Sequence, residues 1–331
     1  MANRLTRFGN ELYTGERSIN FVGKRRIWYI IAGVLVAIAV IFPIVKGFNF
    51  SIEFRGGSQF TIANVSNPSQ HIAQDAVASV DSAAVSRVTV VGGNGIRVQT
   101  DQLTPDQSRA VVTALAAGYG VAESEITSSF IGPSWGADVT RQAIFGLVVF
   151  LALAAIGMAI YFRTWKMSLA AIISLMGDLI ITTGVYSVTG IEVSPAAMIG
   201  VLTILAYSLY DTVVVFDKIR ENTASFGPDS PRTFGEQVNL AVNQTLVRSI
   251  NTSVVAALPV GAILFIGAFA LGADTLRDIS LALFIGIIVG TWSTVFIAAP
   301  MYAQLRERDS SIRKSNQKIL SERQKSKAVP A

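Results

Sequence analysis

Residues 207–222 read Tyr207-Ser208-Leu209-Tyr210-Asp211-Thr212-Val213-Val214-Val215-Phe216-Asp217-Lys218-Ile219-Arg220-Glu221-Asn222 and close a long apolar run that begins near Pro195. This run is long enough to cross a bilayer, which takes about 20 apolar residues in a helix. Asp211 lies inside the run, although a carboxylate at the centre of a membrane helix costs about 2.5–3.5 kcal/mol to insert. On a helix, Tyr207 and Ser208 share the face of Asp211. The stretch therefore predicts a membrane helix whose polar face points into a helix bundle.

The composition of the whole chain indicates the same class. Of its 331 residues, 51 % are hydrophobic and only 15 % are charged, whereas ordinary soluble domains have about 25 % charged residues. Cysteine is absent from the sequence, so neither a disulfide framework nor thiol chemistry is available. His71 is the only histidine, and no cluster of metal-ligating residues stands out. The sequence predicts a polytopic membrane protein with no metal site.

Six apolar runs are long enough to form transmembrane helices. They are residues 27–45, 139–161, 167–188, 196–217, 247–271 and 279–304. The first run could be a signal peptide, but it is long for the apolar core of one and does not end in a small-residue cleavage site. It is interpreted as an uncleaved first helix. Three longer polar segments lie outside the apolar runs. They are the N-terminus, the connection between the fourth and fifth helices, and a C-terminal tail, at residues 1–26, 218–246 and 305–331.

Residues 47–137 have no membrane-length apolar run and predict a small external domain. Residues 48–54 alternate apolar and polar side chains, as in a half-buried strand, and residues 59–62 form a second such segment. A helix, a hairpin, a second helix and a last strand are predicted after them, at residues 68–80, 85–91 with 95–100, 104–115 and 125–131. The expected fold class is thus a six-helix membrane protein with one small α+β, ferredoxin-like domain between the first two helices.

Lysine and arginine residues concentrate on one side of the predicted topology. When the helices are counted alternately, this side receives the N-terminus, residues 162–166, residues 218–246 and the tail. The short loops on the other side carry a single cation, Arg277. Because cytoplasmic loops are enriched in lysine and arginine, both termini are expected in the cytoplasm and the domain outside. The basic termini are interpreted as topology signals and contacts with anionic lipid, rather than as nucleic-acid sites.

The sequence contains one formal match to a catalytic motif. Gly132-Pro133-Ser134-Trp135-Gly136 has the letters of a nucleophile elbow. It leads into a membrane helix rather than a strand–turn–helix unit, and no histidine follows Ser134 in the chain. Its glycines and proline are therefore interpreted as a tight junction between the domain and the membrane. The sequence predicts no catalytic residue and no enzyme activity.

Polar residues within the predicted membrane helices are the remaining candidates. The third helix carries Asp178, and the fifth carries a set that shares one helix face: Gln244, Thr245, Arg248, Asn251 and Thr252. The fourth helix runs inward and the fifth outward, so Asp211 and Arg248 are expected at similar depth. They form either a static buried ion pair that fixes helix register, or a protonatable carboxylate whose partner changes when a proton arrives. Asp178, Tyr207, Ser208, Gln244, Asn251 and Thr252 are expected to support this pair.

Four blocks of the sequence, residues 48–57, 210–222, 243–253 and 280–291, together resemble the SecF family of the bacterial Sec protein-export machinery. The chain departs from the family pattern at Gly177, where histidine is common, and mildly at Glu53, where aspartate is common.

The resemblance implies a subunit of the cytoplasmic membrane that pairs with SecD, joins the SecYEG channel and meets YidC/YajC-type accessory proteins and unfolded secretory polypeptide. It implies the proton gradient as energy source and no cofactor, with Asp211 as the proton-pathway acid and Arg248 as its basic partner.

Two other classes remain open from the sequence. One is a half-transporter of the resistance-nodulation-division type that exports small molecules or lipid, although such pumps usually carry larger external domains. The other is a passive scaffold that holds a channel partner. An indispensable Asp211 would argue against the scaffold, and co-purification with the export channel would argue against an independent pump.

Overall fold

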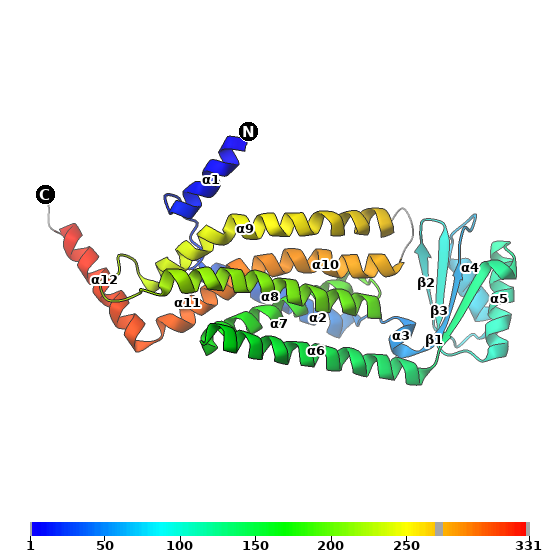
Figure 1. Cartoon of the computed structure of the whole chain (residues 1–331). Helices are drawn as coiled ribbons and strands as arrows, with labels where there is room; N and C mark the ends of the chain where they lie inside the picture. Colours follow the sequence, from blue (N-terminus) through cyan, green and yellow to red (C-terminus); the bar gives the residue numbers. More distant parts are fainter. Residues whose placement is uncertain (1, 269–273, 329–331) are drawn as a thin grey trace.

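In the computed structural model of the chain, residues 2–268 and 274–328 are described. Six helical segments in this part of the chain are long and apolar enough to cross a membrane, and they lie side by side in one bundle (Figure 1). They are Arg25–Lys46, Ser134–Phe162, Trp165–Thr189, Pro195–Thr223, Phe234–Ile266 and Thr275–Glu307. A small α+β domain sits at one end of the bundle, and both chain termini lie at the other (Figure 1). The predicted fold class is confirmed.

The first four spans are continuous helices and the last two contain π-helical turns. The continuous ones are α2 (Arg25–Lys46), α6 (Pro133–Phe162), α7 (Trp165–Thr189) and α8 (Pro195–Thr223). The fifth is α9 (Phe234–Ala262), which runs on into the π-helical turn η2 (Ile263–Ala268). The sixth comprises α10 (Asp274–Ser293), the π-helical turn η3 (Thr294–Ala298) and α11 (Ala299–Glu307). The predicted fifth span, 247–271, ends in residues 269–271, which lie outside the described residues.

The connection between the fourth and fifth spans is much shorter than the sequence predicted. Most of residues 218–246 is helical, because α8 continues to Thr223 and α9 begins at Phe234. Thr233 caps the start of α9 with a capping box: its hydroxyl accepts from the Glu236 amide, and the Glu236 carboxylate accepts from the Thr233 amide. This cap satisfies two backbone donors that the first turn would otherwise leave free. A polar helix start was mistaken for a loop because only the apolar part of the helix was counted.

Small residues bring α8 and α10 into close contact. A Cβ added at Gly286 would lie 2.2 Å from the Ile204 side chain, and one at Gly290 would lie 2.9 Å from the Ser208 side chain. A Cβ at Gly200 would lie 2.8 Å from Ala282. Inside a membrane, apolar burial does not drive helices together, so close van der Waals approach through glycine replaces it. The Gly-x-x-x-Gly spacing of residues 286–290 thus sets the distance between these two helices.

The α+β domain is a four-stranded antiparallel sheet covered by two helices on one face (Figure 1). Its strands are β1 (Gly57–Ile62), β2 (Ser86–Val91), β3 (Gly95–Thr100) and β4 (Ile126–Ile131), in the order β2-β3-β1-β4. The helices are α4 (Gln70–Val80) and α5 (Pro105–Tyr119). Phe60, Ile62, Ile96, Val98 and Leu115 are fully buried between them. The βαββαβ order with β1 in the centre is that of a ferredoxin-like domain.

The predicted strand at residues 48–54 is wrong. Phe50 makes one isolated bridge to Val193 in the loop between α7 and α8, and residues Ile52–Arg55 form a short helix, α3. The Phe50 ring lies 5.6 Å from the Phe48 ring and 6.0 Å from the Phe54 ring. Alternating phenylalanines here reflect this aromatic cluster at the junction with the membrane bundle. The domain therefore starts with β1 rather than with two consecutive strands.

Two glycines allow the chain to turn from α3 into β1. Gly56 has a φ of 77°, and Gly57 has a φ of 137° with its Cα so close to β3 that an added Cβ would lie 2.3 Å from the Thr100 carbonyl oxygen. No side chain fits that position. Gly136 at the start of α6 is equally tight, since a Cβ there would lie 2.7 Å from the Phe54 carbonyl oxygen. The interpretation of residues 132–136 as a tight junction is confirmed.

Candidate functional site

Two carboxylates are buried in the middle of the bundle. Asp178 on α7 is 3 % exposed and Asp211 on α8 is 5 % exposed. Ser208, one turn before Asp211 on the same helix, donates its hydroxyl to Asp178 Oδ2. The polar face predicted for the fourth helix therefore exists, and it joins the two carboxylates through one serine.

Each carboxylate has one oxygen satisfied and one without a hydrogen-bond partner. Asp211 Oδ1 accepts from the Ser249 hydroxyl of α9 at 2.8 Å, while Asp211 Oδ2 is buried and unpartnered. Asp178 shows the same pattern, since its Oδ1 is buried and unpartnered. A buried acceptor without a donor is costly, and a charged one more so. Each free oxygen is therefore a place where a bound proton removes the cost of a buried charge.

The expected direct ion pair between Asp211 and Arg248 is wrong. Arg248 is exposed on the outer side of α9 and acts on Asp211 only at longer range, while its neighbour Ser249 makes the hydrogen bond. The prediction that α8 and α9 meet at this depth is correct, because the contact falls one residue from the expected one. An inward arginine was expected from spacing, but the helix is rotated so that the serine points inward.

The polar residues of α9 divide into two faces. Asn251 is exposed with Arg248, and the Thr252 hydroxyl bonds to the Arg248 carbonyl of its own helix. Gln244 lies near the end of the bundle that carries the termini, where it accepts from Asn222 at 2.9 Å and donates to the Tyr13 carbonyl at 3.1 Å. The inward face carries Thr245, Ser249 and Ser253. These three recur every four residues, a helical signal that was present in the sequence and was missed.

The sixth span contributes hydroxyls that sequence analysis did not single out. The Thr212 and Thr294 hydroxyls are 2.9 Å apart, and the Ser253 hydroxyl bonds to that of Thr291. The Tyr207 hydroxyl reaches Ser253 at 3.4 Å. Thr294 begins the π-helical turn η3, and single π-helical turns inside α-helices are frequent at functional sites. The polar run Thr291-Trp292-Ser293-Thr294 in an otherwise apolar helix was the available signal.

A second cluster of charged residues joins the domain to the bundle. Glu192, in the loop before α8, accepts from Gln99 at 2.7 Å and from Arg97 at 3.5 Å, both on β3. Asp278 on α10 accepts from Ser194 at 2.7 Å, and its carbonyl accepts from the Tyr186 hydroxyl at 3.0 Å. Burial raises the pKa of the Glu192 carboxyl, against the opposing effects of the Gln99 hydrogen bond and the Arg97 charge. Glu192 thus links the loop between α7 and α8 to the sheet, and Asp278 links α10 to Ser194 of that loop and to α7.

Metal binding and the nucleophile motif find no support in the described residues. No group of three or more His, Cys, Asp or Glu side chains in this part of the chain is arranged to hold a metal ion. His71 is exposed on α4. Ser134 lies in the first turn of α6, as the membrane context of its motif predicted. What the arrangement offers chemically is proton uptake and hydrogen-bond exchange at two carboxylates.

The fold and the site together define a multi-pass membrane protein with an ionisable centre inside its helix bundle. The family described as protein export membrane protein SecD/SecF, C-terminal, matches residues 111–308, and the SecD/SecF GG motif matches residues 41–63. The chain belongs to the SecD/SecF family of protein export membrane proteins. A role in protein export follows from this membership.

Two SecF subunits are similar to this chain over most of their length. The protein translocase subunit SecF of Streptomyces coelicolor is 40 % identical over 322 residues, which cover 97 % of this chain and 86 % of that protein. The SecF subunit of Mycobacterium tuberculosis is 39 % identical over 325 residues, covering 96 % and 73 %. The crystal structure of SecDF from Thermus thermophilus, a translocon-associated membrane protein, superposes with a TM-score of 0.74 at 30 % identity. This match covers 88 % of the present chain but only 39 % of the SecDF chain.

Proposed function

We propose that the chain uses the proton gradient across the cytoplasmic membrane to drive a step of protein export, with Asp211 as the group that binds and releases the proton. One observation carries this proposal: Asp211 is buried between two helices, one oxygen is held by Ser249 of the other helix, and the second oxygen is unpartnered. A static structural carboxylate would be expected to have both oxygens satisfied. Asp178, linked to α8 through Ser208, is the second proton-accepting group.

Protonation of Asp211 weakens its hold on α9. The ionised carboxylate accepts a charge-assisted hydrogen bond from Ser249, which is stronger than the bond a neutral carboxyl would accept. Neutralisation also ends the longer-range attraction to Arg248, which cannot itself lose a proton. The contact between α8 and α9 is then weaker, so the two helices can shift more easily, and the shift reaches the external domain through the contacts of Glu192 and Asp278.

The relatives support a pairing with SecD. SecDF of Thermus thermophilus carries the similar region within a longer chain, and we infer that SecD supplies the missing part here as a separate subunit. The SecYEG channel, YidC/YajC-type accessory proteins and unfolded secretory polypeptide are the further partners of this assembly. The protein acts as a transport subunit rather than as an enzyme. Both termini face the cytoplasm and the α+β domain faces outward, in agreement with their places at opposite ends of the bundle (Figure 1).

The decisive experiment measures export into vesicles that contain the assembled complex under an imposed proton gradient. Asp211→Asn keeps the shape of the side chain and removes its titration, so we expect proton-driven export to be lost while complex assembly is retained. Asp211→Glu keeps a titratable group and should retain part of the rate.

Asp217→Asn is the matched control for this experiment. Asp217 lies two turns further along α8 and accepts a hydrogen bond from Tyr161 at the exposed end of the helix. Export by Asp211→Asn at the rate of the unmodified protein would refute the proton-binding role and leave Asp211 as a structural group.

A further inference from the structure

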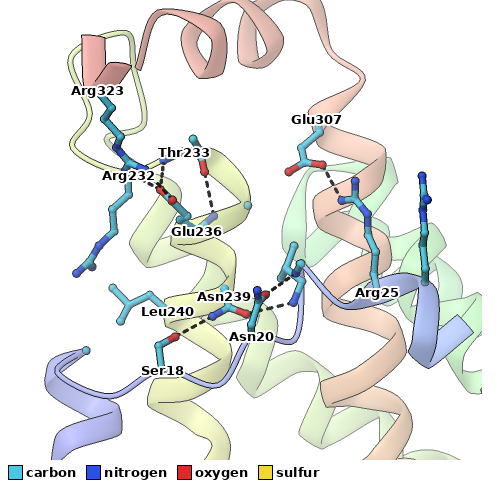
Figure 2. Close-up of a pocket in the computed structure, with 15 residues that line it drawn as sticks. Ser18, Asn20, Arg25, Arg232, Thr233, Glu236, Asn239, Leu240, Glu307 and Arg323 are labelled. Carbon is cyan, nitrogen blue, oxygen red and sulfur yellow. Dashed lines mark hydrogen bonds and ion pairs between the residues drawn. The ribbon is translucent and has the colours of Figure 1, made fainter. Parts of the chain in front are cut away.

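A cavity of about 720 Å³ opens at the end of the bundle that carries the termini. Figure 2 shows its walls: the start of α9, the segment that leads into α2, Glu307 at the end of α11 and Arg323 of α12 (Ser310–Ala328). The segment 18–22 is fixed along α9 by two asparagine side chains. The Asn239 Oδ1 accepts from the amides of Phe21 and Val22, and the Asn243 Oδ1 accepts from the amide of Ile19. The cavity is therefore built from four separate parts of the chain.

The cavity carries a net positive charge. Its lining contains four arginines and two glutamates: Arg25, Arg26, Arg232, Arg323, Glu236 and Glu307. The glutamates are paired at 2.7 Å, Glu307 with Arg25 and Glu236 with Arg323. Arg26 and Arg232 are exposed and make no ion pair with any described residue. Four positive charges and two negative ones leave an excess of two at the membrane surface.

An apolar groove of about 590 Å³ begins on the other side of the same segment. Ser18, Asn20 and Val22 line the charged cavity, whereas Ile19 and Phe21 line the groove. The groove continues into the membrane between α9 and the sixth span. Its walls there include Trp28, Leu246, Ile250, Val254, Trp292 and Phe296.

The groove faces away from the polar side of α9. At about 100° per residue, Ile250 and Ala257 lie about 200° and 180° around the helix from Arg248. A partner subunit that covers the exposed Arg248 and Asn251 would therefore leave the groove facing lipid. The charged cavity has two arginines without an ion-pair partner among the described residues, and an apolar groove lies beside it. This combination is complementary to a phospholipid, whose phosphate is anionic and whose acyl chains are apolar.

We propose that this composite site binds one anionic phospholipid, with its phosphate in the arginine-lined cavity and its acyl chains in the groove. The paired Arg25 and Arg323 shape the cavity and add donors to its rim. A bound lipid would fill the space between the N-terminal segment and the sixth span, and so would hold α9, the helix of Ser249, in place.

Tryptophan fluorescence tests the proposal, because two of the four tryptophans, Trp28 and Trp292, line the groove. Trp135 and Trp165 are exposed elsewhere and are replaced by phenylalanine. The purified full-length chain is placed in phosphatidylcholine bilayers that contain a small fraction of a lipid with brominated acyl chains. This brominated lipid is phosphatidylglycerol in one sample and phosphatidylcholine in the other. We expect brominated phosphatidylglycerol to quench more strongly, with a preference of about fivefold for each contributing arginine.

Charge variants separate the site from general attraction to the membrane surface. Arg26→Gln with Arg232→Gln should abolish the preference, and Arg26→Lys with Arg232→Lys should keep most of it. Arg313→Gln with Lys314→Gln removes the same charge from exposed positions of α12 outside the cavity and should have no effect. Equal quenching by the two lipids, or equal loss in the α12 variant, would overturn the proposal.

Two further outcomes would show that the cavity or the groove does not hold a phospholipid. If inorganic phosphate removes the preference for brominated phosphatidylglycerol, and potassium chloride at equal ionic strength does not, the cavity binds soluble anions. Absence of quenching by either lipid would mean that acyl chains do not enter the groove. Both results would overturn the lipid assignment.

Discussion

Ser249 and Ser208 hold the two membrane carboxylates by neutral hydroxyl groups, and the nearest cation, Arg248, stays at the surface of α9. A hydroxyl can donate to a carboxylate or accept from a carboxyl, so it remains bonded in both protonation states. An arginine would hold the carboxylate in its ionised form and oppose proton uptake. At the scale of single residues, the structure therefore favours a site that exchanges protons over a fixed ion pair.

Ser249→Ala should weaken the site in a charge-dependent way. Loss of the hydroxyl leaves Asp211 without its donor, which should lower the free energy of unfolding by about 1–3 kcal/mol. In the Asp211→Asn background the effect should shrink, because the charged acceptor is gone. Thermal unfolding of the four proteins of this double-mutant cycle measures the coupling. Thr252→Ala, which removes a hydroxyl on the outer face, should be near neutral, and an equal loss from it would contradict the assignment.

Glu192 should make the stability of the domain junction depend on pH. Its pKa is raised by burial, with Asp278 and Glu53 adding to the effect and Gln99 and Arg97 opposing it. The folded protein therefore binds this proton more readily than the unfolded chain does. The free energy of unfolding should then increase as pH falls through the raised pKa, and level off near the unfolded value of about 4.3.

The contribution of Glu192 is measured as a difference between variants. Thermal unfolding from about pH 7 to about pH 5 should show a smaller gain on acidification for Glu192→Gln than for the unmodified protein. Glu125→Gln, at an exposed position of the α+β domain, should leave the profile unchanged. Identical profiles for Glu192→Gln and the unmodified protein would rule out this source of pH dependence.

At the scale of helices, the contact between α8 and α10 combines close approach with a local irregularity. Gly286 and Gly290 allow the two backbones to touch at Ile204 and Ser208. One turn further, the sixth span changes to the π-helical η3 where Thr294 meets Thr212. The two helices are tightly packed between the carboxylates and the α+β domain, and the sixth span is irregular beside the carboxylates. This arrangement allows a shift near the site without separation of the helices.

Gly286→Leu should disrupt this contact. Even the first carbon of the new side chain would fall 2.2 Å from Ile204, and overpacking of this kind lowers the free energy of unfolding by about 1–3 kcal/mol or more. Gly146→Leu in α6 is the matched control, because nothing lies within 4 Å of its added Cβ. The midpoint of thermal unfolding in detergent should fall for the first variant and stay or rise for the second. Equal midpoints would show that the glycine contact is dispensable.

At the scale of the whole molecule, the bundle exposes a polar strip that lipid does not match. Arg248 and Asn251 lie on the outer side of α9 within a membrane-length helix. Charged side chains in such positions usually face another protein or a water-filled cavity. Transporters of related architecture are built from two halves related by an axis along the membrane normal. The strip is therefore expected to meet the second half, SecD under the proposed function.

Cysteine cross-linking in native membranes tests this contact. Asn251→Cys should form a product with a second protein of the export complex, because the position is exposed. Ser208→Cys is buried against Gly290 and should remain unlinked. Cross-linked products from Ser208→Cys but none from Asn251→Cys would contradict the assignment of which faces of α8 and α9 are buried and which are exposed.

Reporter fusions test the orientation of the chain in the membrane. A reporter at Asn94 should be external, and reporters at Ser225 and Ala328 should be cytoplasmic, because the cations concentrate at the end of the bundle with the termini. An external reading at Ala328 would contradict an even number of spans.

The sequence by itself determined the class of protein, the six spans and most of the external domain. These features depend on local signals: membrane-length apolar runs, strand alternation, and caps such as Thr104, whose hydroxyl accepts from the Gln107 amide at the start of α5. Local signals were misleading at residues 48–54 and 218–246. Aromatic alternation there serves a cluster at the junction, and the polar starts and ends of helices look like loops.

Only the tertiary structure decided which polar side chains meet. Spacing placed Asp211 and Arg248 at the same depth, but helical periodicity does not say how far each helix is rotated about its axis. That rotation is set by packing between helices, through contacts such as Gly286 with Ile204 and Gly290 with Ser208. A rotation by one residue position exchanges Arg248 for Ser249, and so exchanges an ion pair for a hydroxyl that can serve both protonation states of Asp211.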